Sequence, residues 1–128
     1  MDTAKTILLA EHDPFLINVY SRELRKYGYK TSVVSDGKII LNRIRSVEPA
    51  LMILDAELPH SESDYKGLSV LKSLRDDVML KDLKVVMLHD VILPKNKDKF
   101  FRLGVHNHFS KAGHTAQEIV QEVKRILS

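Results

Sequence analysis

The fold follows from the stretch Leu51-Met-Ile-Leu-Asp-Ala-Glu-Leu-Pro59, in which a continuous apolar run ends at an acidic residue. A short run of this kind is typical of a strand that is buried on both faces of a parallel sheet. Four similar runs occur elsewhere in the chain. The predicted strands are therefore Lys5–Ala10, Tyr29–Val34, Ala50–Leu54, Leu83–Leu88 and Val105–Phe109.

Five stretches of helical period alternate with these strands. The first begins at the N-cap and proline Asp13-Pro14, and the last begins at the capping box Thr115-Ala-Gln-Glu118. The second starts at Asp36 or Gly37 and ends ahead of Pro49. The third carries Leu68, Leu71 and Leu74 inward, and the fourth ends at Gly104. Right-handed crossovers make this a three-layer, doubly wound (βα)5 fold of the α/β class. We expect one domain over residues 1–128.

Composition narrows the functional classes. The chain has no cysteine, which excludes disulfides, thiolate metal clusters and a cysteine nucleophile. Its apolar runs are too short to span a bilayer, so we expect no membrane insertion and a cytoplasmic protein. The 20 basic and 17 acidic residues are interspersed, so the net charge of +3 does not indicate direct nucleic-acid binding.

Polar residues follow four of the predicted strands. In a doubly wound sheet, ligands gather beyond the carboxyl ends of the strands. A site made of carboxylates, histidines and one lysine is therefore predicted there. Its candidate residues are Glu11-His12-Asp13, Asp55, His89-Asp90 and Ser110-Lys111.

Three segments in this order, Ile7–Pro14, Leu51–Pro59 and Phe109–Lys111, resemble the signature segments of response-regulator receiver domains, the signalling modules of two-component systems. The resemblance extends over essentially the whole chain. It implies a flavodoxin-like sheet with the strand order 2-1-3-4-5.

The resemblance also implies a chemistry. Asp55 stands at the phosphoacceptor position, where it would take a phosphoryl group from a sensor histidine kinase, a phosphotransfer protein or a small donor. Lys111 matches the lysine that neutralises the phosphoryl oxygens. Mg²⁺ would be held by Glu11, Asp55 and the backbone carbonyl of Glu57. Catalysis would amount at most to self-phosphorylation and autodephosphorylation at Asp55, not to a metabolic reaction.

Four positions depart from the family pattern. His12 replaces an acidic residue, and because Mg²⁺ prefers oxygen ligands this should weaken Mg²⁺ binding. At the switch positions, His89 replaces a threonine or serine and His108 replaces an aromatic residue, while Ala112 replaces a proline. Residues 60–66 also lengthen the loop after Pro59, either covering Asp55 in part or lying on the surface.

In receiver domains, partners dock on the surface formed by the fourth helix, fifth strand and fifth helix. Here the fourth helix carries Lys95, Lys97 and Lys99, which favours an acidic downstream protein partner. A homodimer through this surface is a further prediction.

Alternative interpretations remain open. The first hypothesis is an atypical receiver that is phosphorylated at Asp55, and the second is a pseudo-receiver that binds proteins without phosphate control. A flavodoxin-like cofactor binder or small enzyme is a third, although no glycine-rich phosphate loop follows a strand. Finally, Glu11, His12, Asp55 and His89 offer mixed ligands that suit Zn²⁺ or Ni²⁺.

Overall fold

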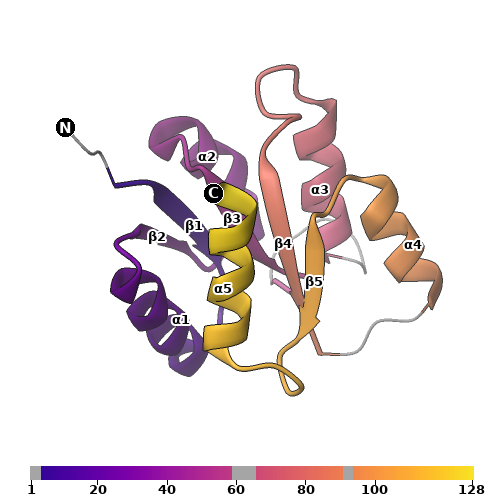
Figure 1. Cartoon of the computed structure of the whole chain (residues 1–128). Coiled ribbons are helices and arrows are strands. Elements are labelled where there is room, and N and C mark those ends of the chain that lie inside the picture. Colours follow the sequence, from indigo (N-terminus) through magenta and orange to yellow (C-terminus); the bar gives the residue numbers. More distant parts are fainter. Residues whose placement is uncertain (1–3, 59–65, 91–93) are drawn as a thin grey trace.

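The computed structural model describes residues 4–58, 66–90 and 94–128, and its strands and helices alternate along the chain (Figure 1). The strands are β1 (Thr6–Ala10), β2 (Lys30–Val34), β3 (Leu51–Asp55), β4 (Lys84–His89) and β5 (Asn107–Ser110). The helices are α1 (Pro14–Lys26), α2 (Ile40–Val47), α3 (Lys66–Asp76), α4 (Pro94–Arg102) and α5 (Ala116–Leu127), with a short 3₁₀ turn at Gly37–Ile39. No described helix is long and apolar enough to cross a membrane.

All five strands are parallel and lie in the order β2-β1-β3-β4-β5, so the predicted fold class and strand order are confirmed. The strand boundaries are shifted: β1 to β4 each begin one residue later than predicted, and β3, β4 and β5 each end one residue later. The largest difference is at the start of β5, which begins at Asn107 rather than at the predicted Val105. Val105 and His106 instead follow the turn that ends α4. Gly104 has a positive φ of 78°, and the Val105 N–H donates a hydrogen bond back to the Phe100 carbonyl.

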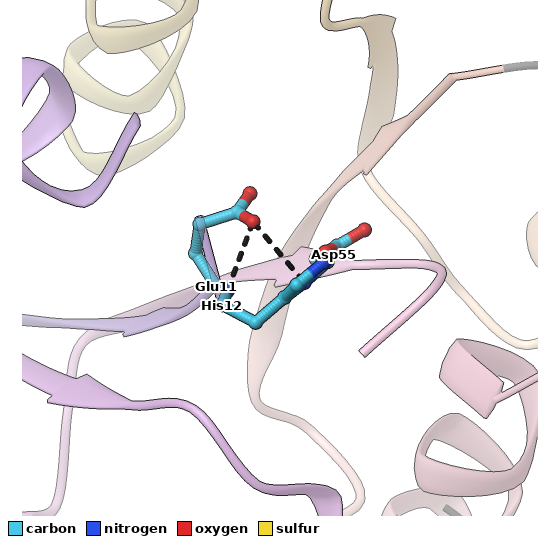
Figure 2. Close-up of side chains that lie close together, drawn as sticks. All are labelled: Glu11, His12 and Asp55. Atoms are coloured by element: carbon cyan, nitrogen blue, oxygen red, sulfur yellow. Dashed lines mark hydrogen bonds and ion pairs between the residues drawn. The ribbon is translucent and has the colours of Figure 1, made fainter. Parts of the chain in front are cut away.

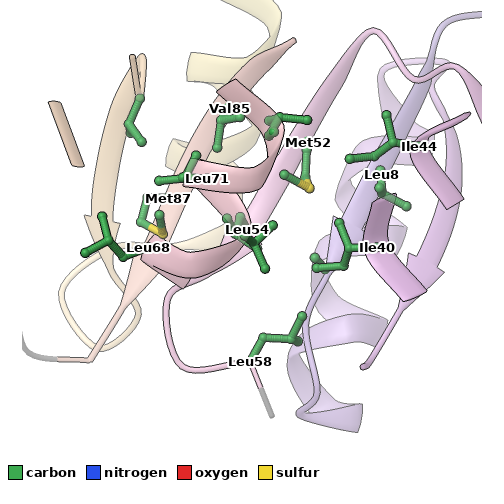
Figure 3. Packing of buried hydrophobic residues seen from close by; sticks show 14 of the residues in the cluster. Leu8, Ile40, Ile44, Met52, Leu54, Leu58, Leu68, Leu71, Val85 and Met87 are labelled. Atoms are coloured by element: carbon green, nitrogen blue, oxygen red, sulfur yellow. The ribbon is translucent and has the colours of Figure 1, made fainter. Parts of the chain in front are cut away.

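Alternate residues of the buried strands face two different helix layers. On one face, Ile7 and Leu9 of β1 pack against α1 and α5, which Figure 1 shows together on one side of the sheet. On the other face, Leu8 and Ala10 pack against the layer formed by α2, α3 and α4, part of which appears in Figure 3. Both faces are apolar because helices cover both, which explains why the strands are continuous apolar runs.

The N-terminal turn of α3 lies directly against the backbone that follows β3. The Gly67 N–H donates a 2.8 Å hydrogen bond to the Ala56 carbonyl, and a Cβ at Gly67 would lie only 2.7 Å from Ala56 Cα. Only glycine allows this approach without displacing the backbone. The contact therefore holds in place the residue next to Asp55.

Candidate functional site

Three strands of the sheet bring charged side chains to one edge. Glu11 directly follows β1, Asp55 is the last residue of β3, and Lys111 directly follows β5. Because the strands are parallel, their carboxyl ends lie at the same edge. The two carboxylates are fully buried, at 0% exposure each, and the Lys111 side chain is 10% exposed.

Lys111 lies between the two carboxylates. Its Nζ is 3.1 Å from Glu11 Oε2 and 3.1 Å from Asp55 Oδ2, and it donates a 3.2 Å hydrogen bond to Glu11 Oε1. The backbone N–H of Lys111 donates a hydrogen bond to the His89 carbonyl of β4. This bond fixes the position of the Lys111 backbone, from which the side chain extends. One ammonium therefore serves two buried acids.

The charges of this group perturb one another. Burial raises the pKa of Glu11 and repulsion from Asp55 raises it further, although nearby backbone N–H groups and Lys111 oppose the rise. Burial alone would lower the pKa of Lys111, but attraction to Asp55 and Glu11 outweighs it and raises that pKa. The lysine therefore stays charged at neutral pH.

Asp55 presents its two oxygens differently. Oδ1 accepts a 2.9 Å hydrogen bond from the Glu57 N–H. Oδ2 is buried and accepts no hydrogen bond from the residues that the structure describes, although Lys111 and His12 lie at ion-pair distance from it. One oxygen is thus anchored by the backbone, while the other faces the cationic side chains.

His12 completes the group (Figure 2). Its Nδ1 is 2.7 Å from Asp55 Oδ2 and 3.5 Å from Glu11 Oε1, and its side chain is 43% exposed. The backbone N–H groups of His12 and Asp13 both donate to Glu11 Oε1, at 2.9 and 3.2 Å. One potential ligand atom from each of Glu11, His12 and Asp55 lies within 4.8 Å of the others, so these residues could together hold a metal ion.

The two histidines at the predicted switch positions contact each other. His89 Nε2 and His108 Nδ1 are joined by a 2.9 Å hydrogen bond, and the Phe101 ring stands edge-on to His108 at 5.4 Å between centroids. His89 is 7% exposed, and its Nδ1 has no hydrogen-bond partner among the described residues. The fourfold metal set predicted from the sequence is therefore not assembled, because His89 pairs with His108 instead.

Acid should weaken the fold through His89. Burial, together with the neighbouring His108, lowers the pKa of His89 from 6.5 to about 4. Between these values the unfolded chain binds a proton at this histidine that the folded chain does not. The contribution of neutral His89 to the free energy of unfolding is therefore complete above pH 6.5 and is lost as the pH drops toward 4. The difference corresponds to roughly 3 kcal/mol. We expect urea unfolding of His89→Gln to show a shallower pH dependence over this range than the wild type.

The matched control for this prediction is His106→Gln, because His106 lies in the same part of the chain but its side chain is exposed. Burial also lowers the pKa of His106, but without the His108 hydrogen bond and the deep burial of His89, so this variant should lose less of the pH dependence than His89→Gln does. Equal slopes for the wild type and His89→Gln would contradict the assignment to His89.

The remaining predicted residues are dispersed. The Glu57 side chain is exposed, and slight burial and the nearby Asp90 raise its pKa. Lys97 and Lys99 are exposed on α4, while the side chain of Lys95 lies outside the described part of the structure. The predicted loop insertion falls mostly on residues 59–65, which also lie outside the described ranges.

Two aromatic residues near the site were not among the predicted site residues. Tyr20 of α1 is buried, and burial followed by the charge of Glu11 raises its pKa to about 12. Phe101 of α4 reaches His108, as described above. Hydrophobic period does not indicate which polar group an aromatic ring contacts.

Comparisons with known proteins agree with this geometry. The family model described as the response regulator receiver domain matches residues 7–124. The DNA-binding response regulator MtrA of Mycolicibacterium smegmatis is 35% identical over 89 residues, which cover 69% of this chain and 36% of that protein. The transcriptional regulatory protein BaeR of Escherichia coli O6:H1 is 27% identical over 121 residues, covering 94% and 47%. The chain thus matches less than half the length of these two relatives.

Solved structures give the same picture. The crystal structure of a protein assigned as a response regulator, from Chloroflexus aurantiacus, superposes with a TM-score of 0.84 at 26% identity and covers 98% of both chains. A CheY-like receiver domain protein from Methanospirillum hungatei also reaches 0.84, at 18% identity, covering 98% of this chain and 94% of its own. The second match supports the fold alone.

Proposed function

The chain belongs to the family of response regulator receiver domains, and from this premise we propose that it accepts a phosphoryl group on Asp55 and signals through protein contacts. Receiver domains interact with histidine kinases or phosphotransfer proteins, and such a protein is the proposed donor here. One observation carries the proposal: a buried carboxylate stands at the sheet edge with an ammonium 3.1 Å from its outer oxygen.

The residues divide the chemistry between them. Asp55 Oδ2 would attack the phosphorus of the donor and form an O–P bond, while the donor atom leaves with the electrons of the broken bond: an imidazole nitrogen takes a proton from solvent, and an acetate oxygen leaves as the anion. The Glu57 N–H holds Oδ1, which leaves Oδ2 to react. Lys111 neutralises the charge of the phosphoryl oxygens, the main requirement of phosphoryl transfer.

A divalent cation belongs to this proposal, because receiver domains bind Mg²⁺ at an acidic pocket. Glu11 Oε2 suits such an ion, since it is a buried carboxylate oxygen without a hydrogen bond from the described residues. Glu11, Asp55 and the Glu57 carbonyl would hold the ion, which would supply further positive charge to the phosphoryl group. His12 fits Mg²⁺ poorly because its donor is nitrogen.

The test is phosphorylation by a small donor. The protein is incubated with acetyl phosphate and either Mg²⁺ or Mn²⁺, and its intact mass is then measured. We expect one phosphoryl adduct on the wild type and none on Asp55→Asn. Asp90→Asn is the matched control, because Asp90 is an exposed aspartate that follows β4 at the same edge, and it should keep the adduct. An adduct that survives in Asp55→Asn, or none with either ion, would refute the proposal.

A second candidate function is a pseudo-receiver, a protein-interaction module without phosphate control. The observation that favours it is the His89–His108 hydrogen bond, which joins the two switch positions directly. Beryllofluoride, which imitates a bound phosphoryl group, distinguishes the candidates. Changes in the amide spectrum of β4 and β5 support a switch, whereas an unchanged spectrum supports the pseudo-receiver.

The partner surface is also part of the proposal. It consists of α4, β5 and α5, where Lys97 and Lys99 are exposed. Such a cationic helix favours an acidic protein surface or a second copy of the chain with a complementary face. Charge reversal at Lys97 and Lys99 should weaken partner binding or dimerisation, and an unchanged assembly would count against this surface.

A further inference from the structure

We propose that the site at the ends of β1 and β3 selects a divalent transition-metal ion, such as Mn²⁺, Co²⁺, Ni²⁺ or Zn²⁺, over Mg²⁺. Its ligands would be the imidazole of His12 and the carboxylates of Glu11 and Asp55. The inference rests on the proposed function in that it names the ion used at the same site. Metal binding can nevertheless be measured without any phosphoryl donor.

The spacing of the three side chains fits one ion. Donors that share a transition metal at about 2.0–2.2 Å lie roughly 3–4 Å from each other. His12 Nδ1 is 3.5 Å from Glu11 Oε1 and 2.7 Å from Asp55 Oδ2, and Figure 2 shows the three side chains converging. A shift of the half-exposed His12 ring of a few tenths of an ångström would therefore suffice to bind an ion.

Two buried oxygens point to a missing ligand, independently of the clustering. Glu11 Oε2 and Asp55 Oδ2 belong to fully buried side chains, yet neither accepts a hydrogen bond from the described residues. A buried carboxylate oxygen that accepts no hydrogen bond keeps part of its desolvation cost even beside an ammonium. Two carboxylates face the single ammonium of Lys111, so a cation would both coordinate the oxygens and balance the charge.

The nitrogen donor decides which ion is preferred. Mg²⁺ demands near-octahedral oxygen coordination, whereas imidazole suits Zn²⁺, Ni²⁺ and Co²⁺. The backbone N–H of His12 donates to Glu11 Oε1, which keeps the imidazole near the carboxylates. Its exposed face leaves the ion a path from solvent. We therefore expect affinity to increase from Mn²⁺ through Co²⁺ to Ni²⁺, with Mg²⁺ the weakest.

The test is calorimetric titration of the tag-free protein with each metal chloride alone. On the wild type we expect Co²⁺, Ni²⁺ and Zn²⁺ to bind on the order of tenfold or more tightly than Mg²⁺. His12→Asp should narrow this preference by gaining Mg²⁺ affinity and losing Co²⁺ affinity. The visible spectrum of bound Co²⁺ provides a second measurement, because replacing a nitrogen ligand by oxygen shifts its bands.

The control separates this site from surface histidines. His106→Gln removes an exposed imidazole from the other end of β5 and should leave all affinities unchanged. Equal binding of Mg²⁺ and Co²⁺ to the wild type, or unchanged Co²⁺ binding in His12→Asp, would overturn the inference. A site that prefers Co²⁺ but gives no adduct with acetyl phosphate would refute the proposed function and leave the metal assignment intact.

Discussion

Replacing Lys111 by methionine is expected to lower the free energy of unfolding by roughly 3–5 kcal/mol at neutral pH. The lysine side chain is 10% exposed, and its ammonium is the counter-charge of two fully buried carboxylates. Methionine keeps the apolar stem but leaves Glu11 and Asp55 without that charge. Urea unfolding measures the loss, and the phosphoryl adduct should disappear in the same variant.

The pH dependence of this loss follows from its cause. Without Lys111, the pKa of Glu11 should lie even higher in the folded chain than in the wild type, where burial and Asp55 already raise it. A carboxyl whose folded pKa exceeds its unfolded value destabilises the fold as the pH rises through that range. The deficit of Lys111→Met should therefore be small in acid and grow toward neutral pH.

Two variants provide controls for this prediction. Adding Asp55→Asn to Lys111→Met removes one of the uncompensated charges and should recover part of the lost stability. Lys26→Met removes an exposed lysine whose ion pair with Glu23 lies on the surface of α1, and it should change little. The prediction fails if Lys111→Met is no more damaging than Lys26→Met.

Much of the site could be predicted because the sheet edge is a consequence of topology. Once the apolar runs were assigned to parallel strands, Glu11, Asp55 and Lys111 had to lie at the same edge. The stretch that ends at Asp55 shows this well, since each of its residues from Leu51 to Asp55 is buried in β3. Strand identity therefore determined where the acids lie.

Side-chain pairing could not be predicted in the same way. The sequence places His12 and His89 near one edge, but it does not indicate that the first contacts Asp55 and the second contacts His108. The second contact depends on the register of β4 with β5, in which Met87 pairs with His108 and His89 with Ser110. The rotamers that bring these side chains together are set by packing, and hydrophobic period carries no signal for them.

A second feature without a sequence signal is Arg75, a residue of α3 that resembles any charged helix position. In the structure its guanidinium donates to four backbone carbonyls. Nε bonds to Leu103 at 2.6 Å and Nη2 to Gly104 at 3.1 Å, while Nη1 bonds to Lys81 and Leu83 at 2.7 and 2.8 Å. It thus joins the end of α3 to the segment before β4 and to the turn before β5.

Arg75→Met is therefore expected to cost roughly 2–4 kcal/mol of unfolding free energy, because four carbonyls lose a charged donor at once. Arg75→Lys should recover little, since an ammonium cannot reproduce the planar fork that reaches carbonyls on both segments. Arg45→Met is the control, as Arg45 makes an exposed ion pair with Asp77 and should matter little. Denaturant unfolding compares the three variants, and equal stability of Arg75→Met and Arg45→Met would contradict the prediction. Amide exchange should also accelerate at Gly104 and Val105. These residues precede β5, so increased mobility at Gly104 and Val105 should affect His108 and the proposed partner surface more than Asp55.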